Sequence, residues 1–306
     1  MLVAIIDLGT NTFNLLIAQL LPPKAYHIKY STKLPVKLGK GGINKNQLMP
    51  EAIERGIAAL EEYKTIIEQY KVDKVYAFGT SAIREATNSQ VFLKRAADIG
   101  IKIKVISGVE EAEYIYKGVQ LGLDIGSKPV LIIDIGGGST EFIIADNKKI
   151  FWKHSFLLGV SRLLEMFNPS DPVLPAEINK IENYLKDELK PLYSAVKQFP
   201  VNELIGSSGS FDSFAEIIAH RFHTPDVLNN KTEYNFDMEE VSVIFNELIA
   251  SSNEQRLNMK GLVQMRVNMI VLAALLVRFV LRELNLTEMR LSTFSLKEGV
   301  MSELMK

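Results

Sequence analysis

The stretch LIIDIGGGSTEFIIA, residues 131–145, places an acid and three consecutive glycines between two apolar segments. The same plan stands near the amino terminus in AIIDLGTNTFNLLIA, residues 4–18. When Asp7 is aligned with Asp134, six of the fourteen positions from Ile5 to Ala18 are identical. Each copy predicts a strand that ends near an aspartate, a turn of small residues and a returning strand. We therefore expect two related hairpins and, with them, two related domains.

The composition is that of a soluble globular protein large enough for two domains. The chain has 306 residues, of which 47% are hydrophobic and 23% are charged. Its formal net charge is -1, so it lacks the basic field that is typical of nucleic-acid binding. A polyanionic ligand would have to be held by local cations and backbone amides.

Cysteine is absent, which excludes thiolate chemistry, cysteine-ligated metals and disulfides and favours a reducing compartment. The first residues, MLVAIIDLG, have no basic segment before the apolar run, so no signal peptide is expected. The longest apolar stretch, MIVLAALLVRFVL at 269–281, is short for a membrane span and contains Arg278. We expect it to form a buried helix in a cytoplasmic protein that has no membrane partner.

Strands and helices alternate along most of the chain, which is typical of an α/β fold. Residues 50–70 have apolar positions at helical spacing and begin with proline. Residues 102–122 and 201–218 each indicate a strand, a turn of small residues and a helix. The predicted architecture is therefore a pair of α/β domains.

The predicted domain boundary lies near residues 118–128, where LGLDIGSKP follows a helix. This gives an amino-terminal domain at 1–120 and a carboxy-terminal domain at 121–295. The last helix, 296–306, either ends the second domain or returns to the first.

Three turns of small residues carry the functional prediction: GTNT at 9–12, GGGST at 136–140 and GSSGS at 206–210. Glycine and serine leave backbone amides accessible, and such amides form an anion-binding concavity to which a helix start adds its positive dipole end. Any one of these turns is also explained as a plain hairpin or a strand-to-helix connection. Together they favour a phosphate-sized cleft between two facing domains.

Seven motifs follow one another along nearly the whole chain: IDLGTNTFNL, VKLGKGG, GTSAIREATN, ISGVEEAEYIYKG, IIDIGGGSTEF, GSSGS and LKEGVMSEL. In this order they resemble the exopolyphosphatase and guanosine pentaphosphate phosphatase (Ppx/GppA) family, in its short, two-domain form. The resemblance implies two ribonuclease-H-like domains, as in actin-like ATPases and sugar kinases, that flank an interdomain cleft. It also implies metal-assisted hydrolysis of the terminal phosphate of inorganic polyphosphate, of guanosine pentaphosphate, or of both.

Glu110 and Glu111 in SGVEEA stand at the start of a predicted helix. Acids at that place are also explained by the helix dipole alone. The resemblance puts the family's catalytic base on the second glutamate. Glu111 is therefore the predicted base, and Glu110 is the alternative.

Asp134 and Glu141 lie on either side of the glycine turn, near the ends of the two predicted strands. Two carboxylates placed in this way can share a magnesium ion, which prefers oxygen ligands and retains waters. A turn-capping aspartate and a solvated glutamate would explain the same residues. The family pattern favours Asp134 and Glu141 as catalytic ligands of Mg²⁺ or another divalent cation. In the first hairpin Asp7 is opposed by Asn14 rather than by an acid, so Asp7 is expected to reach a metal only through water.

Arg84 in TSAIREA is predicted to lie in the first turn of a helix, where a cation opposes the helix dipole. The resemblance assigns this arginine to the substrate phosphate, as a catalytic residue. The other phosphate-binding residues are expected in the three turns and near Arg84: Thr10, Asn11, Thr12, Ser81, Gly136, Gly137, Gly138, Ser139, Gly209 and Ser210.

Several residues depart from the family pattern. Lys37 and Lys297 stand where arginine is usual, Ser208 replaces a glycine, and Asn268 and Thr293 replace acids. These changes concern the contacts to a nucleotide or a phosphate chain more than the catalytic centre.

Two other classes of protein share parts of this pattern. An actin-fold kinase or ATPase would have the same hairpins and third loop, and a non-catalytic sensor would bind polyphosphate or guanosine pentaphosphate without turnover. SGVEEA favours activation of water over kinase chemistry, and the presence of Glu111, Asp134 and Glu141 argues against a sensor. The sequence leaves open the preferred substrate, the physiological metal and whether the chain forms a homodimer.

Overall fold

A computed structural model describes residues 1–21 and 25–305 of the chain. Its first half contains a five-stranded sheet with the strand order β3-β2-β1-β4-β5. The strands are β1 (Leu2–Leu8), β2 (Thr12–Leu21), β3 (Ala25–Pro35), β4 (Lys74–Gly79) and β5 (Ile103–Val105). The helical elements are η1 (Ile43–Lys45), α1 (Pro50–Gln69), α2 (Ser81–Glu85), α3 (Ser89–Asp98) and α4 (Gly108–Gly122).

The second half contains a six-stranded sheet with the strand order β10-β11-β9-β6-β7-β8. The strands are β6 (Val130–Ile135), β7 (Thr140–Ala145), β8 (Ile150–Phe156), β9 (Glu203–Ser207), β10 (Glu233–Asn235) and β11 (Glu288–Ser292). The helical elements are α5 (Val160–Phe167), α6 (Pro175–Glu188), α7 (Lys190–Gln198), α8 (Gly209–Phe222), η2 (Pro225–Leu228), α9 (Met238–Ala250), α10 (Asn253–Leu257), η3 (Gln264–Arg266), α11 (Ile270–Glu283) and α12 (Leu296–Leu304).

The two sheets share one topology. β1 pairs antiparallel with β2 and parallel with β4, and β6 pairs in the same way with β7 and β9. β3 and β8 extend the antiparallel side, β5 and β11 extend the parallel side, and β10 is an additional edge strand. The predicted pair of hairpins and the α/β fold of two ribonuclease-H-like units are thus confirmed. We call the first sheet with α1–α3 the first lobe and the second sheet with α5–α11 the second lobe; the predicted domain limits, 1–120 and 121–295, stay predictions.

The central strands are buried on both faces, which explains why their sequences are continuous apolar runs rather than alternating ones. Ala4 and Ile6 of β1 face the core of the first lobe, whereas Val3 and Ile5 face the other way. The side chains of β6 also point to both faces of their sheet: some face the core of the second lobe, and the others face the space between the sheets. Because side chains alternate along a strand, Asp7 points to the same side as Ile5.

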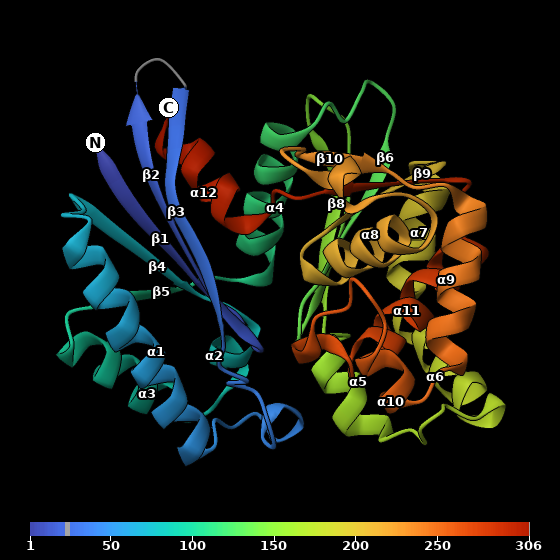
Figure 1. Ribbon diagram of the computed structural model, residues 1–306, viewed down its shortest axis with the longest axis horizontal. Coiled ribbons are helices and arrows are strands. Elements are labelled where there is room, and N and C mark those ends of the chain that lie inside the picture. The colour runs from blue at the N-terminus through green and yellow to red at the C-terminus, as the bar shows by residue number, and fades with distance from the viewer. Residues whose placement is uncertain (22–24, 306) are drawn as a thin grey trace.

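Two helices, α4 and α12, lie between the lobes and join the two sheets into one core (Figure 1). They cross at very short range, because a Cβ on Gly118 would lie 1.9 Å from the carbonyl oxygen of Ser295 and one on Gly299 would lie 1.7 Å from that of Tyr114. α12 also contacts β1. Strands of the first lobe therefore pack against the last helix of the chain.

The apolar stretch at 269–281 forms most of α11, whose side chains are largely buried in the second lobe, as predicted. Arg278 within it forms an ion pair with Glu182, with 3.5 Å between Nη2 and Oε1. Within residues 1–21 and 25–305 no helix is long and apolar enough to cross a membrane.

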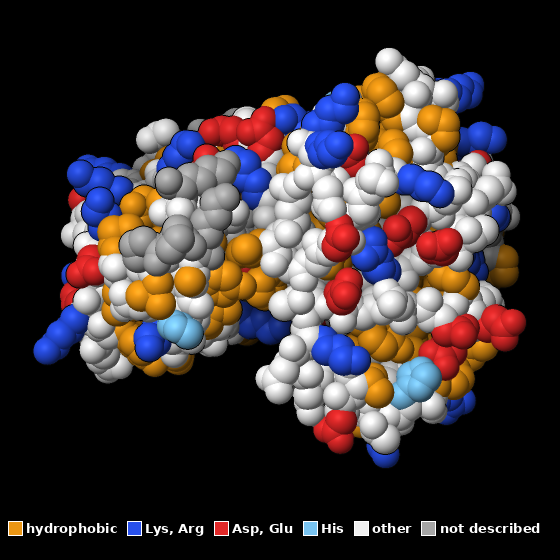
Figure 2. All heavy atoms as spheres, turned by 90° about the horizontal axis from the view of Figure 1, so that it is seen from above, with side chains coloured by type: hydrophobic (Ala, Val, Ile, Leu, Met, Phe, Trp, Pro, Cys, Tyr) orange, Lys and Arg blue, Asp and Glu red, His pale blue; other side chains and the backbone are white. Residues whose placement is uncertain are grey.

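The surface seen from above in Figure 2 carries acidic and basic side chains interspersed with apolar ones. That face shows no continuous basic area, in keeping with the nearly neutral formal charge of -1.

Candidate active site

A cavity of about 520 Å³ opens between the lobes and is lined by both hairpin turns, the third loop, the start of α4 and the start of α12. Most residues predicted for the site line this cavity: Thr10, Asn11, Thr12, Ser81, Glu111, Asp134, Gly136, Gly137, Gly138, Ser139, Gly209 and Ser210. Of the predicted residues, all of which belong to the described part of the chain, Arg84 and Glu141 do not line it. They lie behind the lining residues.

The two hairpin turns have the same internal hydrogen bond. The amide of Gly9 donates to the carbonyl of Thr12, and the amide of Gly136 donates to that of Ser139, each at 3.0 Å. The turns also meet: a Cβ on Gly137 would lie 2.8 Å from Cγ of Asn11. The duplicated sequence therefore builds two equivalent turns that face each other across the cleft.

The triglycine turn presents donors that other parts of the protein leave free. Within the described residues, the amides of Gly137, Gly138 and Ser139 donate to no backbone acceptor. The hydroxyl oxygen of Ser81, which is 1% exposed, is buried without a hydrogen-bond partner. It lies over the turn, because a Cβ on Gly138 would be 2.6 Å from it. Buried donors without partners are costly, so this group is suited to an anionic ligand.

Asn11 differs from the other predicted phosphate ligands, because its side chain forms hydrogen bonds from the first lobe to the second. Its Oδ1 accepts a hydrogen bond from Ser161 Oγ at 2.6 Å, and its Nδ2 donates to the sulfur of Met269 at 3.1 Å. A phosphate role for this side chain would require that these contacts change.

Aspartates at equivalent positions of the two hairpins have different partners. Asp7 is opposed by Asn14, whose amide donates to Asp7 Oδ2 at 2.9 Å. Asp134 is opposed by Glu141, which cannot donate when ionised, and instead Asp134 Oδ2 accepts hydrogen bonds from the hydroxyls of Ser207 and Ser295. Only the second hairpin thus brings two acids together.

Strand alternation directs these acids to the side of the sheets where α4 begins. Burial is the main cause of the raised pKa of Asp7, about 6, against which the amide of Asn14 acts. Burial also raises the pKa of Glu141, and the nearby Asp134 carboxylate raises it further. Glu141 Oε1 accepts a hydrogen bond from Ser155 Oγ at 2.6 Å.

Glu111 joins this group of acids from the first turn of α4. The residue is 7% exposed, and its carboxylate accepts a hydrogen bond from Arg84 Nη1 at 2.8 Å. Burial and the Glu141 carboxylate raise the pKa of Glu111 above its ordinary value, and Arg84 opposes this shift. A carboxylate with a raised pKa that lines the cleft fits the requirements of a general base near neutral pH.

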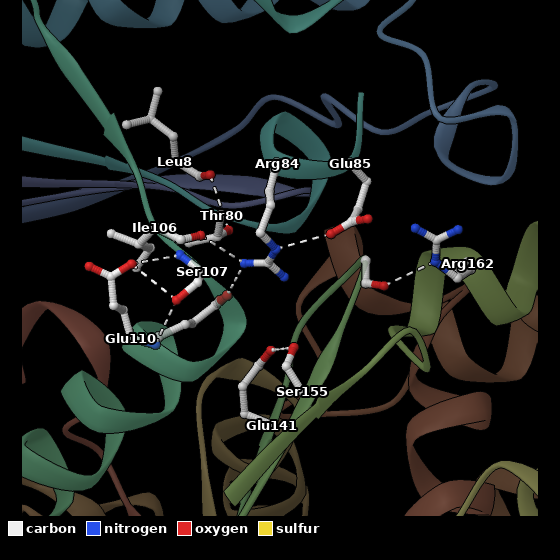
Figure 3. Close-up of polar contacts among 12 residues, drawn as sticks. Leu8, Thr80, Arg84, Glu85, Ile106, Ser107, Glu110, Glu141, Ser155 and Arg162 are labelled. Atoms are coloured by element: carbon white, nitrogen blue, oxygen red, sulfur yellow. Dashed lines mark hydrogen bonds and ion pairs between the residues drawn. The ribbon is translucent and has the colours of Figure 1, made fainter. Parts of the chain in front are cut away.

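Arg84 binds protein acids rather than facing the cleft. Figure 3 shows its guanidinium between Glu85 on one side and the start of α4 on the other. Its Nε donates to Glu85 at 3.0 Å, and its Nη1 also donates to the carbonyl of Ile106 at 3.2 Å. In this arrangement Arg84 holds the carboxylate of Glu111.

Glu110, the alternative base, has a local structural role. It forms a capping box with Ser107: the Glu110 amide donates to Ser107 Oγ, and the Glu110 carboxylate accepts from the Ser107 amide at 2.9 Å. It also pairs with Lys104, and these contacts lower the pKa of Glu110 to about 2. Such a carboxylate is a weak base.

The donors present fit a magnesium ion that is bound by few protein atoms. Asp134 and Glu141 supply hard oxygen ligands, and burial together with the neighbouring Asp134 carboxylate raises the pKa of Glu141. Over residues 1–21 and 25–305, no group of three or more His, Asp or Glu side chains is arranged to hold a metal ion alone. Magnesium would therefore rely on waters and on the substrate's phosphate oxygens, as is usual for this ion.

The cleft also contains cations. Lys33 of β3, Arg266 of η3 and Lys297 of α12 line the cavity around one acid, Asp212. Burial and the neighbouring Arg266 lower the pKa of Lys33. Burial alone would lower the pKa of Lys297, but the Glu298 carboxylate raises it above its ordinary value. Lys33, Arg266 and Asp212 also line a second cavity, of about 470 Å³, that adjoins the first.

The third loop contains a strained residue. Ser208 has φ 65° and ψ -176°, a conformation that is essentially restricted to glycine. It lies between β9 and α8, and its hydroxyl donates to the carbonyl of Ile135 at 3.2 Å. The departure from the family's glycine therefore has a conformational cost.

Replacing Ser208 by glycine is expected to stabilise the protein. Relief of about 1–3 kcal/mol of strain exceeds the loss of one hydrogen bond of about 1 kcal/mol, so Tm should rise by about 2 °C. Thermal unfolding followed by circular dichroism measures the change. Ser208→Ala is the matched control, because it loses the same hydrogen bond and keeps the strain, and it should lower Tm. A lower Tm for Ser208→Gly would contradict the strain argument.

Several residues of the cleft lie outside the motifs that predicted it. Lys33 belongs to an ordinary edge strand, and Ser295, which donates to Asp134, precedes the last helix. Arg266 lies in none of the seven motifs, and Lys297 belongs to LKEGVMSEL, where it stands in place of the family's usual arginine. A pattern of hydrophobic periodicity could have found none of them, because each reaches the cleft through tertiary folding.

Comparison with known proteins agrees with the fold and the cleft. The model of the Ppx/GppA phosphatase family matches residues 19–306. The crystal structure of an exopolyphosphatase from Cytophaga hutchinsonii is 36% identical, with a TM-score of 0.96 over 100% of this chain and 98% of that one. The PPX-GPPA enzyme of Aquifex aeolicus is 26% identical, with a TM-score of 0.81 over 99% of both chains.

A guanosine-5'-triphosphate,3'-diphosphate pyrophosphatase from Photobacterium profundum is 28% identical over 99% of this chain and 59% of its own length. The match to the family model covers far more than half of the chain, and the duplicated hairpins, the third loop and SGVEEA all contribute to one cleft. The chain belongs to the Ppx/GppA phosphatase family.

Proposed function

We propose that this protein removes the terminal phosphate from inorganic polyphosphate, from guanosine pentaphosphate, or from both, by attack of water. The observation that carries the proposal is the position of Glu111: a buried carboxylate with a raised pKa that lines the same cleft as the free amides of the triglycine turn. A chain of 306 residues without cysteine suits the reducing cytoplasm, where we propose that it acts.

In the proposed reaction, the terminal phosphate lies against the amides of Gly137, Gly138 and Ser139 and the hydroxyl of Ser81. Glu111 orients a water molecule and accepts its proton as the new phosphorus–oxygen bond forms and the bridging bond breaks. Arg84 holds the carboxylate of Glu111 in place and favours its ionised form, because it opposes the rise in the pKa of Glu111. The shortened phosphate chain or guanosine tetraphosphate leaves with the electron pair of the broken bond.

A divalent cation would be held by Asp134 and Glu141, and when bound it would withdraw negative charge from the phosphoryl oxygens. Glu141 already uses one oxygen for Ser155. Asp134, which lines the cavity, is therefore the main protein ligand in this proposal.

The charge distribution of the cleft supports one direction of binding. Glu111 and Asp134 line only the first cavity, whereas Lys33 and Arg266 line both the first and the adjoining second cavity. A polyphosphate or guanosine pentaphosphate would place its terminal phosphate near the acids and its remaining phosphates among the cations. The adjoining cavity of about 470 Å³ gives room for the rest of the substrate.

The proposal is tested by measuring phosphate release from polyphosphate and guanosine pentaphosphate at matched concentrations, with magnesium or with a chelator. We expect magnesium-dependent release from at least one substrate without a hydroxyl acceptor. Release that requires an acceptor would indicate a kinase. Tight binding without release would indicate a sensor.

Arg84→Ala is expected to lower kcat/KM by about 10–100-fold, since it removes a charge-assisted hydrogen bond to the base. Arg84 lowers the pKa of Glu111, so this pKa should rise further in the variant and the acidic limb of the pH–rate profile should move to higher pH. The kcat/KM of Arg84→Lys should lie between that of the wild type and that of Arg84→Ala. If the acidic limb of the pH–rate profile of Arg84→Ala does not move and its Tm is lowered, Arg84 has only a structural role.

A further inference from the structure

All three carbonyls of the triglycine turn are bound by the start of α5. The carbonyl of Gly136 accepts a hydrogen bond from the amide of Val160 at 3.0 Å, and that of Gly137 accepts from the amide of Ser161 at 2.9 Å. The carbonyl of Gly138 accepts from a side chain, Nε of Arg162, at 3.1 Å (Figure 3).

These bonds determine the direction of the free amides. A peptide unit is planar and trans, so its carbonyl and its N–H point in opposite directions. Because the carbonyls of Gly136, Gly137 and Gly138 point to α5, the amides of Gly137, Gly138 and Ser139 point away from it. The third amide differs from the other two, since its direction depends on one arginine side chain.

The same guanidinium also binds the first lobe. Nη1 of Arg162 donates to the carbonyl of Ile43 at 3.0 Å and to Oδ1 of Asn44 at 3.2 Å, and Nδ2 of Asn44 donates back to the carbonyl of Arg162 at 3.1 Å. One helical turn later, Glu165 accepts a hydrogen bond from the amide of Gly41 at 2.6 Å. α5 of the second lobe is thus attached to residues 41–44 of the first.

Residues 41–44 are connected through Gly39 to the first hairpin turn, since the amide of Ile43 donates to the carbonyl of Gly39 at 2.9 Å. The amide of Gly39 donates to the carbonyl of Thr10 at 3.1 Å, and the amide of Lys37 donates to that of Asn11 at 2.8 Å. Arg162 therefore binds the second hairpin turn directly, through Gly138, and also binds the segment that supports the first hairpin turn, through Ile43.

This placement is not explained by stability alone. Arg162 is 5% exposed and, among the described residues, pairs with no carboxylate, and its Nη2 is buried without a partner. Buried charges without a counterion are costly. Arg256, a second buried arginine of the same lobe, instead has an ion pair with Asp171 at 2.7 Å. A buried arginine without an ion pair, in a place where it binds both lobes, points to a function.

We propose that Arg162 is a positioning residue that turns the Ser139 amide toward the ligand and couples this orientation to contact between the lobes. The anion site is then complete only when α5 and residues 41–44 are together. The inference rests on the proposed phosphate-binding role of the triglycine turn, and it adds a residue from outside the cleft lining.

The test measures the affinity for inorganic phosphate by calorimetry in the wild type, Arg162→Lys and Arg162→Ala. A lysine ammonium cannot reach the carbonyls of Gly138 and Ile43 together with fixed geometry, so phosphate affinity should fall by about 10-fold or more in both variants. Guanidinium ion at low millimolar concentration should restore binding in Arg162→Ala, and it should have no such effect on the wild type. Arg290→Lys is the matched control, because Arg290 binds the carbonyl of Asp124 and Glu203 and lines neither cavity.

Unchanged phosphate affinity in Arg162→Lys, or the same loss in Arg290→Lys, would overturn the inference. If Arg162→Ala does not fold, Asn44→Ala and Glu165→Ala remove only the contacts between the lobes, and both should weaken phosphate binding several-fold. Wild-type affinity in both would overturn the coupling between lobes. A wild type that neither binds phosphate nor releases it from substrates would overturn the proposed function. If the wild type does both, the proposed function holds, and the Arg162 variants then test the further inference by themselves.

Discussion

Glu111→Gln lowers kcat by about 10²–10⁴-fold and leaves substrate affinity nearly unchanged: this is the result expected if Glu111 is the base. Glutamine has the size of glutamate and still accepts a hydrogen bond from Arg84, but it cannot take a proton from water. The measurement compares kcat from phosphate release with equilibrium binding of the same substrate. The pKa of Glu111 is raised by burial and by Glu141, so activity should fall as the pH drops through that raised value.

Glu110→Gln is the neighbouring control and should leave kcat within a few-fold of the wild type. Its carboxylate is directed to Ser107 and Lys104, away from the cleft. The pKa of Glu110 is depressed to about 2, so its stabilising effect is present above the unfolded value and is lost as the pH falls toward 2. Glu110→Gln should therefore cost stability at neutral pH, about 1 kcal/mol or less as for other helix caps, and little near pH 2.

Opposite results would reassign the role. A crippled Glu110→Gln with an active Glu111→Gln would move the base by one residue. If neither variant loses turnover, activation of water through SGVEEA is wrong, and the kinase and sensor alternatives gain support.

Asp134→Asn is expected to lower magnesium-dependent turnover by about 10²-fold or more, because it removes a charged oxygen ligand from the cleft. The amide can keep a hydrogen bond with Ser207 or Ser295, so the fold should persist. The concentration of magnesium that gives half-maximal activity should rise. Glu141→Gln should act in the same direction and more weakly, since Glu141 does not line the cavity.

Asp7→Asn, the equivalent change in the first hairpin, is the control for Asp134→Asn. Asp7 is already paired with Asn14, so Asp7→Asn should affect the magnesium requirement less than Asp134→Asn does. Activity is titrated against magnesium, and Tm is measured for each variant. Wild-type activity of Asp134→Asn at limiting magnesium would rule out the proposed metal ligand.

The parts of the protein that could be predicted are those encoded locally. The strand–Asp–turn–strand pattern occurs twice, and it led to both sheets and to the two facing turns. Arg84 was expected at the substrate, but it binds Glu111, which lies 27 residues away in sequence. Asn11 bonds Ser161, 150 residues away. Contacts between residues so far apart in sequence depend on how the two lobes pack. The sequence pattern of a single segment contains no information on that packing.

The position of α12 has a consequence for how the chain is made. The interlobe face of β1, with Val3 and Ile5, is covered in part by residues of α12 such as Val300 and Met301. Synthesis proceeds from the amino terminus, so β1 leaves the ribosome long before α12, the helix that covers it. Until α12 has been synthesised, the interlobe face of β1 stays partly uncovered. The nascent chain therefore cannot finish folding lobe by lobe, because the interlobe core is complete only when α12 packs against β1.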